Sequence, residues 1–172
     1  MEIVPIFDAH LYSFKYPGEE FDELERLLDE WNDIEMLRNF FEENSQDLKY
    51  FQIEVDDAII QTRKEANALR KKLINLSKTV NPDLDSMFAN LDDYETRIVP
   101  LAKQKSKRRW LRIYALRIDT NTYIITGGAI KLTHEMKDRL HTAKELDKLE
   151  SGRNYLKDQG VFDIDSFNEL DI

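Results

Sequence analysis

The sequence predicts an α+β fold with a strand and helices in its N-terminal half, an antiparallel β-meander and a C-terminal helix. Of the 172 residues, 41% are hydrophobic, which is enough to bury a core. Apolar residues recur with helical spacing over residues 19–44 and 56–79. The strand-like residues 110–118, followed by a turn and by residues 123–126, indicate two paired antiparallel strands.

The N-terminal elements follow from local composition. Residues 2–16 are rich in Ile, Val, Phe and Tyr, and Pro5 near their beginning favours a strand at the edge of the sheet. A Pro-Gly turn at residues 17–18 ends this strand. Residues 19–44 then read as helix with an acidic first turn, and Trp-Asn-Asp at 31–33 is expected to divide it into two helices.

The middle of the chain contains the most regular helical pattern. Residues 51–55 suggest either a short strand or the beginning of the next helix, which we expect over residues 56–79. Asn-Pro at 81–82 ends that helix. Residues 83–94 favour a loop or a short helix, and residues 96–102 favour a strand.

The meander is expected to have two different faces. Alternation predicts a core face formed by Leu111, Ile113 and Ala115. The opposite face, formed by Arg112, Tyr114 and Leu116, is the candidate functional face. Residues 119–122 are predicted to be the hairpin turn, since Asn121 tolerates positive φ. The glycines at 127–128 are expected to end or bulge the returning strand and to position Lys131.

The closing segment reads as a helix followed by a short tail. Thr142 and Glu145 have the spacing of a capping box, and Gly160 marks the helix end. The tail from residue 161 has the pattern of a short amphipathic turn that packs back on the fold. No linker or repeat interrupts the chain, so we expect one domain over 1–172, with an acidic helical half (1–94) and a basic meander plus helix (95–160).

Composition and missing motifs exclude several function classes. Without cysteine the chain has no disulfide scaffold and no thiol chemistry, and it lacks a signal-peptide pattern or an apolar run of about 18 residues. We therefore expect a soluble cytoplasmic protein that does not contact a membrane. No nucleotide-binding glycine motif and no GxSxG elbow occurs, and His134 and His141 lack HExxH spacing, so we expect neither a cofactor nor a metal.

Charge is unevenly distributed along the chain. Residues 1–100 carry 11 Lys and Arg against 23 Asp and Glu, whereas residues 101–160 carry 14 against 7. The net charge of −9 therefore hides a basic segment inside an acidic chain. Such a segment is either a footprint for a polyanion or an internal partner of the acidic helices.

Cations and aromatic residues are interleaved within this basic segment. Cations bind phosphate and aromatic rings stack on bases, and single-stranded RNA recognition requires both. The cations are Arg109, Arg112, Arg117 and Lys131, and the aromatic residues are Trp110, Tyr114 and Tyr123. The alternative is that the aromatic residues are core residues and that the arginines pair with the acidic helices.

The order of elements resembles that of the RelE/ParE/HigB-type toxins. In those toxins a strand carries an arginine followed by an aromatic residue, and the last strand leads through a small residue to a lysine. Arg112 with Tyr114 in LRIYAL, and Gly127 and Gly128 with Lys131 in YIITGGAIK, stand in these places. The similarity covers roughly residues 95–160, and this chain is longer than those toxins and acidic overall.

The resemblance implies a metal-independent mRNA endoribonuclease of a type II toxin-antitoxin system. Its partners would be RNA or the ribosome, and a cognate antitoxin-like protein. By analogy Arg112 would hold phosphate, Tyr114 would stack or donate, and Lys131 or His134 would exchange protons. RNA would be bound by Arg109, Trp110 and Arg117.

A second function class is compatible with the same sequence. The excess of acidic residues over the first 100 positions suits a non-catalytic interaction protein whose helices bind a basic protein partner. Both hypotheses predict an α+β fold, and they differ in which surface is used.

Overall fold

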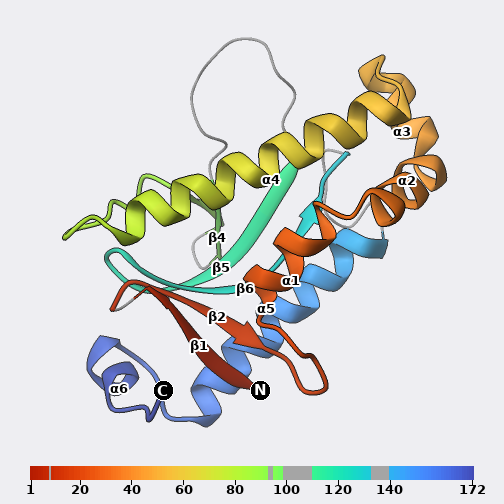
Figure 1. Ribbon diagram of the computed structural model, residues 1–172. Coiled ribbons are helices and arrows are strands. Elements are labelled where there is room, and N and C mark those ends of the chain that lie inside the picture. Colours follow the sequence, from red (N-terminus) through yellow and green to blue (C-terminus); the bar gives the residue numbers. More distant parts are fainter. Residues whose placement is uncertain (8, 93–94, 99–109, 133–139) are drawn as a thin grey trace.

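The computed structural model describes residues 1–7, 9–92, 95–98, 110–132 and 140–172, and contains a six-stranded sheet covered on both faces by helices (Figure 1). The strand order across the sheet is β1-β2-β6-β5-β4-β3. The strands are β1 Glu2–Phe7, β2 Leu11–Lys15, β3 Phe88–Asp92, β4 Glu95–Ile98, β5 Leu111–Asp119 and β6 Thr122–Ile130. The helices are α1 Glu23–Glu30, α2 Ile34–Glu43, α3 Ser45–Phe51, α4 Val55–Ser77, α5 Leu140–Asp158 and α6 Ile164–Asn168.

The sheet is mixed because the N-terminal hairpin joins it in parallel. β2 pairs in parallel with β6, from Leu11 opposite Tyr123 to Ser13 opposite Ile125. The remaining neighbours, β1 with β2 and the meander β3-β4-β5-β6, are antiparallel. The predicted α+β class is therefore confirmed, with strands and helices first, then an antiparallel meander and a C-terminal helix.

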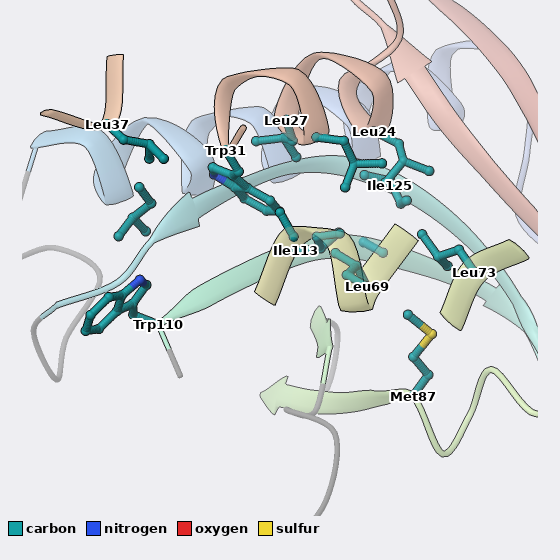
Figure 2. Packing of buried hydrophobic residues seen from close by; sticks show 14 of the residues in the cluster. Leu24, Leu27, Trp31, Leu37, Leu69, Leu73, Met87, Trp110, Ile113 and Ile125 are labelled. Atoms are coloured by element: carbon teal, nitrogen blue, oxygen red, sulfur yellow. The ribbon is translucent and has the colours of Figure 1, made fainter. Parts of the chain in front are cut away.

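The first hydrophobic core lies between the sheet and the N-terminal helices. Leu24 and Leu27 of α1, Trp31 at the C-cap of α1, and Leu69 and Leu73 of α4 pack toward the sheet, as Figure 2 shows. The sheet side of this core includes the predicted core face of β5, with Ile113 and Ala115 buried and Leu111 partly buried.

The second core lies on the opposite face of the sheet, under α5 and α6. Leu149 and Leu156 of α5 and Phe167 of α6 cover it. Beneath them lie Tyr114 and Leu116, so the face of β5 that we predicted to be functional is also a packing face. Periodicity assigned the two faces correctly, but it could not reveal that a later helix covers the second one.

The glycine pair lies inside β6 rather than at its end. The strand continues through Gly127 and Gly128 to Ile130, while a register shift at Thr126 forms a bulge immediately before the pair. A Cβ at position 128 would lie 2.6 Å from the carbonyl oxygen of Arg112 and 2.8 Å from Leu27 Cδ1. The predicted bulge is thus confirmed and the predicted strand end is wrong; the missing side chain admits α1 on this face.

Two aspartates explain why the first helical stretch divides in two. The carboxylate of Asp22 accepts hydrogen bonds from the amides of Leu24 and Glu25 and begins α1. Asp33 does the same for Glu35 and Met36 at the start of α2. Each cap satisfies amides that have no partner within the helix. The break predicted at residues 31–33 is confirmed.

Other boundaries differ from the sequence prediction. The predicted single strand over residues 2–16 is a hairpin that turns at Ala9, whose φ is 61°. Residues 83–94 contain β3 instead of only the predicted loop or short helix. The helix α3 was not predicted. Thr142 lies within α5, which begins at Leu140, so it is not an N-cap. The part of the predicted strand 96–102 after Ile98 lies outside the described residues.

Candidate functional site

Trp110 is a core residue in the structure. Its exposed fraction is 1%, and its ring lies 5.7 Å from that of Phe41 and 6.1 Å from that of Phe51. The indole Nε1 donates a hydrogen bond of 2.8 Å to Oγ1 of Thr62 on α4. The ring is therefore enclosed and partnered, and it presents no face on which a base can stack.

Tyr114 is equally buried, on the opposite face of the sheet. Its exposed fraction is 1%, and it packs in the core beneath α5. The expectation that it forms an open face with Arg112 is wrong for this structure, because the last helix occupies that face. Tyr123 is buried as well, which supports the alternative that these aromatic residues are core residues.

Arg112 and Lys131 come to the same end of the sheet. Arg112 is opposite Ala129 in the β5-β6 ladder, and the amide of Lys131 donates to the carbonyl of Trp110 at 2.8 Å. Both side chains are half-buried, and Nη1 of Arg112 donates to the carbonyl of Leu111. The strand register thus juxtaposes two of the predicted cations where β5 begins.

Arg117 lies toward the other end of β5. It lies five positions after Arg112, which corresponds to roughly 16 Å along a strand. It forms an ion pair of 3.4 Å with Asp85, and 44% of its side chain is exposed. Arg117 therefore does not share one site with Arg112 and Lys131. Arg109 and His134 lie outside the described residues.

A hydrogen-bonded network holds the turn next to Arg117. Asn121, at φ 56°, accepts with its side chain from the amides of Leu84 and Asp85. Asp85 Oδ1 in turn accepts from the amide of Asn121 and, at 2.5 Å, from the hydroxyl of Tyr123. Burial and then the neighbouring Asp85 raise the pKa of Tyr123. Because these polar groups hydrogen-bond to one another, we infer that the network has a structural role.

The sequence did not predict a second group of charged residues, which we call the α1–α5 charge cluster. It lies just beyond the end of β2 and beside β6, where side chains of α1 and α5 meet. It consists of Tyr16, Glu23, Arg26, Glu145 and Lys148. The pairing of β2 with β6 stops at Ser13 opposite Ile125, two residues before Lys15 ends β2, and Glu145 and Lys148 lie against Gly127 beyond this pairing.

Ion pairs connect the cluster from helix to helix. Arg26 donates to both carboxylate oxygens of Glu23 at 2.9 Å, and it also pairs with Glu30. Nζ of Lys148 lies 2.9 Å from Glu23 Oε2 and 3.4 Å from Glu145 Oε1. Glu23 and Glu145 are buried, while Arg26 and Lys148 are partly exposed. The two buried carboxylates are thus paired with two cations that lie nearer the surface.

The environment of Glu145 favours its neutral form. Burial raises its pKa to about 7; nearby Lys148 opposes the shift and Glu23 adds to it. Within the described part of the chain, its buried Oε2 has no hydrogen-bond partner. Burial, followed by Glu23 and Glu145, also raises the pKa of Tyr16, whose hydroxyl donates to the carbonyl of Thr126 at 2.9 Å. Carboxyls that titrate near neutrality are suited to proton exchange.

Local sequence patterns around the carboxylates of this cluster predicted other roles for them. Glu145 was assigned to a capping box, and Glu23 to an acidic first turn. Glu145 fits against Gly127, which has no Cβ, and Lys148 links Glu145 to Glu23, which is more than a hundred residues away in the sequence. Only the packed fold brings the two carboxylates to one lysine.

A scan against protein-family models and searches of curated proteins and of solved structures found no match to this chain. The resemblance to RelE/ParE/HigB-type toxins therefore rests on the residues and the element order. In the described ranges, no helix is long and apolar enough to cross a membrane. Those ranges also contain no group of three or more His, Cys, Asp or Glu side chains placed to hold a metal ion.

Proposed function

We propose that this chain is a toxin-like, metal-independent mRNA endoribonuclease of a type II toxin-antitoxin system. The observation that carries the proposal is the juxtaposition of Arg112 and Lys131 on β5 and β6. These are the two described cations that stand at the positions of the toxin pattern. The mixed sheet supports the same assignment, since an N-terminal strand, helices, an antiparallel meander and a final helix occur in the order that the resemblance implies.

In the proposed reaction the ribose 2′-hydroxyl attacks the adjacent phosphate and expels the 5′-oxygen of the next nucleotide. The guanidinium of Arg112 stabilises the charge that develops on phosphorus-bound oxygens. Lys131 exchanges a proton with the attacking or leaving oxygen. Arg109 and His134 remain proposed contributors. Trp110 and Tyr114 instead hold β5 in place from the two cores.

The test is RNA cleavage by purified protein, with free mRNA and with translating ribosomes. Arg112→Ala and Lys131→Ala are each expected to reduce the rate about 100-fold, a typical loss for a charge-stabilising or proton-exchanging group. Lys71→Ala, at an exposed position of α4, is the matched control and should cleave like wild type. Absence of cleavage by wild type, or equal cleavage by every variant, would contradict the proposal.

A second candidate function uses the acidic helices. Between residues 19 and 57 the exposed acids far outnumber the exposed bases Arg38 and Lys49. The exposed acids are Glu19, Glu20, Glu25, Asp29, Asp33, Glu35, Glu42, Glu43, Glu54, Asp56 and Asp57. Ile34 of α2 adds an exposed apolar contact among them. This surface suits a basic protein partner.

The second candidate predicts binding that does not need RNA. A small basic protein from the native host should bind the nuclease-treated chain at low salt and dissociate as salt rises. Reversing two acids of α2, Glu35→Lys with Glu42→Lys, should abolish binding, while Glu150→Gln on α5 should not. Binding that survives the reversal would show that the acidic surface is not the interface.

A further inference from the structure

Glu145 occupies a position that a carboxylate rarely takes. Its side chain is 8% exposed, and Oε2 lies 1.9 Å from the point where a Cβ of Gly127 would stand. Among the residues that the structure describes, this oxygen has no hydrogen-bond partner. A buried charged oxygen without a partner is costly, and the neutral acid reduces this cost.

The charges around Glu145 do not balance when every carboxyl is ionised. Lys148 contacts both Glu145 and Glu23, and Arg26 contacts both Glu23 and Glu30. Three carboxylates therefore share two cations. One proton on the cluster restores neutrality, and Glu145 is the buried member with the longer ion pair.

Among the residues that the structure describes, the other elements packed near Glu145 contribute a phenol, a guanidinium and no further carboxylate partner. Tyr16, which follows β2, directs its hydroxyl to the carbonyls of Thr126 and Lys148. On β5, Arg112 and Tyr114 lie on the face of the sheet that α5 covers. His141 precedes Glu145 by one turn in α5 and is a further titratable group to control.

We propose that Glu145 holds a proton in the folded protein below neutral pH, and that loss of this proton above neutral pH weakens the packing of α5 on β6. The helix α5 is then attached in a pH-sensitive manner to the face that contains Tyr114. This inference does not depend on the proposed function, because it follows from Gly127, Glu145 and the unequal charges of the cluster.

The sign of the effect follows from proton linkage. The pKa of Glu145 is about 7 when α5 is packed and near its ordinary value of 4.5 when the helix is detached. The packed state thus binds more protons between these values, and it loses stability as pH rises toward 7. The equilibrium constant for detaching α5 should increase about 30-fold between pH 5.5 and pH 8.

Hydrogen exchange of the full chain tests the proposal. Amide protection in α5, corrected for the intrinsic pH dependence of exchange and referenced to α4, should fall from pH 5.5 to pH 8 in wild type. Glu145→Gln should abolish that fall, because its side chain is neutral throughout. Glu150→Gln, at an exposed site on the same helix, and His141→Asn should retain it.

Two results would overturn the proposal. One is a fall in protection that persists in Glu145→Gln or disappears in His141→Asn. The other comes from a carbon-detected NMR titration of wild type, which also decides the question if Glu145→Gln does not fold. A midpoint for the Glu145 carboxyl near 7 supports the proposal, whereas a midpoint at or below about 5 contradicts it.

Discussion

Gly127 and Glu145 fit together because residue 127 has no side chain: the carboxylate oxygen Oε2 occupies space that a Cβ would need. On the other face of β6, Gly128 faces Leu27 of α1 and Trp31 at the C-cap of that helix. Adjacent positions of one strand thus admit one helix from each side. The glycine pair determines how closely both helices approach the sheet, which is a packing role and not a phosphate-binding one.

The two glycines should respond differently to alanine. In Gly128→Ala the new Cβ meets the carbonyl oxygen of Arg112, a backbone atom of the neighbouring strand, so a loss of about 1–3 kcal/mol is expected. In Gly127→Ala the nearest atom belongs to the flexible Glu145 side chain, which can turn away at a smaller cost. Urea denaturation measures both variants. Unchanged stability in Gly128→Ala would contradict this packing.

The alkaline limb of the stability profile should reflect Tyr16 and Tyr123. Burial raises the pKa of both phenols above the ordinary value of 10. The folded protein therefore keeps protons that the unfolded chain releases, and stability falls as pH rises above 10. Absorbance titration should show Tyr16 and Tyr123 ionising above the ordinary phenol range.

Single tyrosine variants check the assignment. Tyr16→Phe and Tyr123→Phe should each remove one late-ionising phenol from the absorbance titration and reduce the loss of stability above pH 10. The same change at Tyr155, a half-buried tyrosine of α5 that packs against Phe14, is the matched control. Seven phenols ionising together in the folded wild type would contradict the prediction.

The hydrogen bond between Trp110 and Thr62 should contribute to stability. Thr62→Val keeps the shape of the side chain but removes the acceptor, which leaves the buried indole N–H without its partner. A loss of about 1–3 kcal/mol is expected. Thr79→Val, at an exposed site where the hydroxyl also bonds to a backbone carbonyl, should change stability much less. Equal losses in both variants would argue against a special role for the Trp110 contact.

Local patterns predicted the elements whose determinants lie close together in the chain. Asp33 begins α2 through hydrogen bonds from nearby amides, and Asn121 forms the hairpin turn because asparagine tolerates positive φ. The first hairpin was missed because it turns at Ala9, which is not a typical residue for positive φ. The strand β3 was missed because its acidic surroundings favour loops in isolation.

The candidate site was less predictable because it depends on distant contacts. Alternation placed Arg112 and Tyr114 on one face of β5, but it could not show that α5 covers Tyr114. In the same way, the pattern around Glu145 suggested a helix cap. The burial of Glu145 against Gly127 arises from packing between two segments that are distant in the sequence, so local patterns could not predict it.

The most direct measurement of the central claim is the chemical identity of the ends of RNA fragments made by the wild-type protein. Attack by the 2′-hydroxyl forms a bond to phosphorus and releases the next nucleotide with a 5′-hydroxyl. We predict 2′,3′-cyclic phosphate ends paired with 5′-hydroxyl ends. We further predict that these fragments are lost when the attacking ribose is replaced by 2′-deoxyribose and in Arg112→Ala. Intact RNA, or fragments with 5′-phosphate ends, would contradict the assignment.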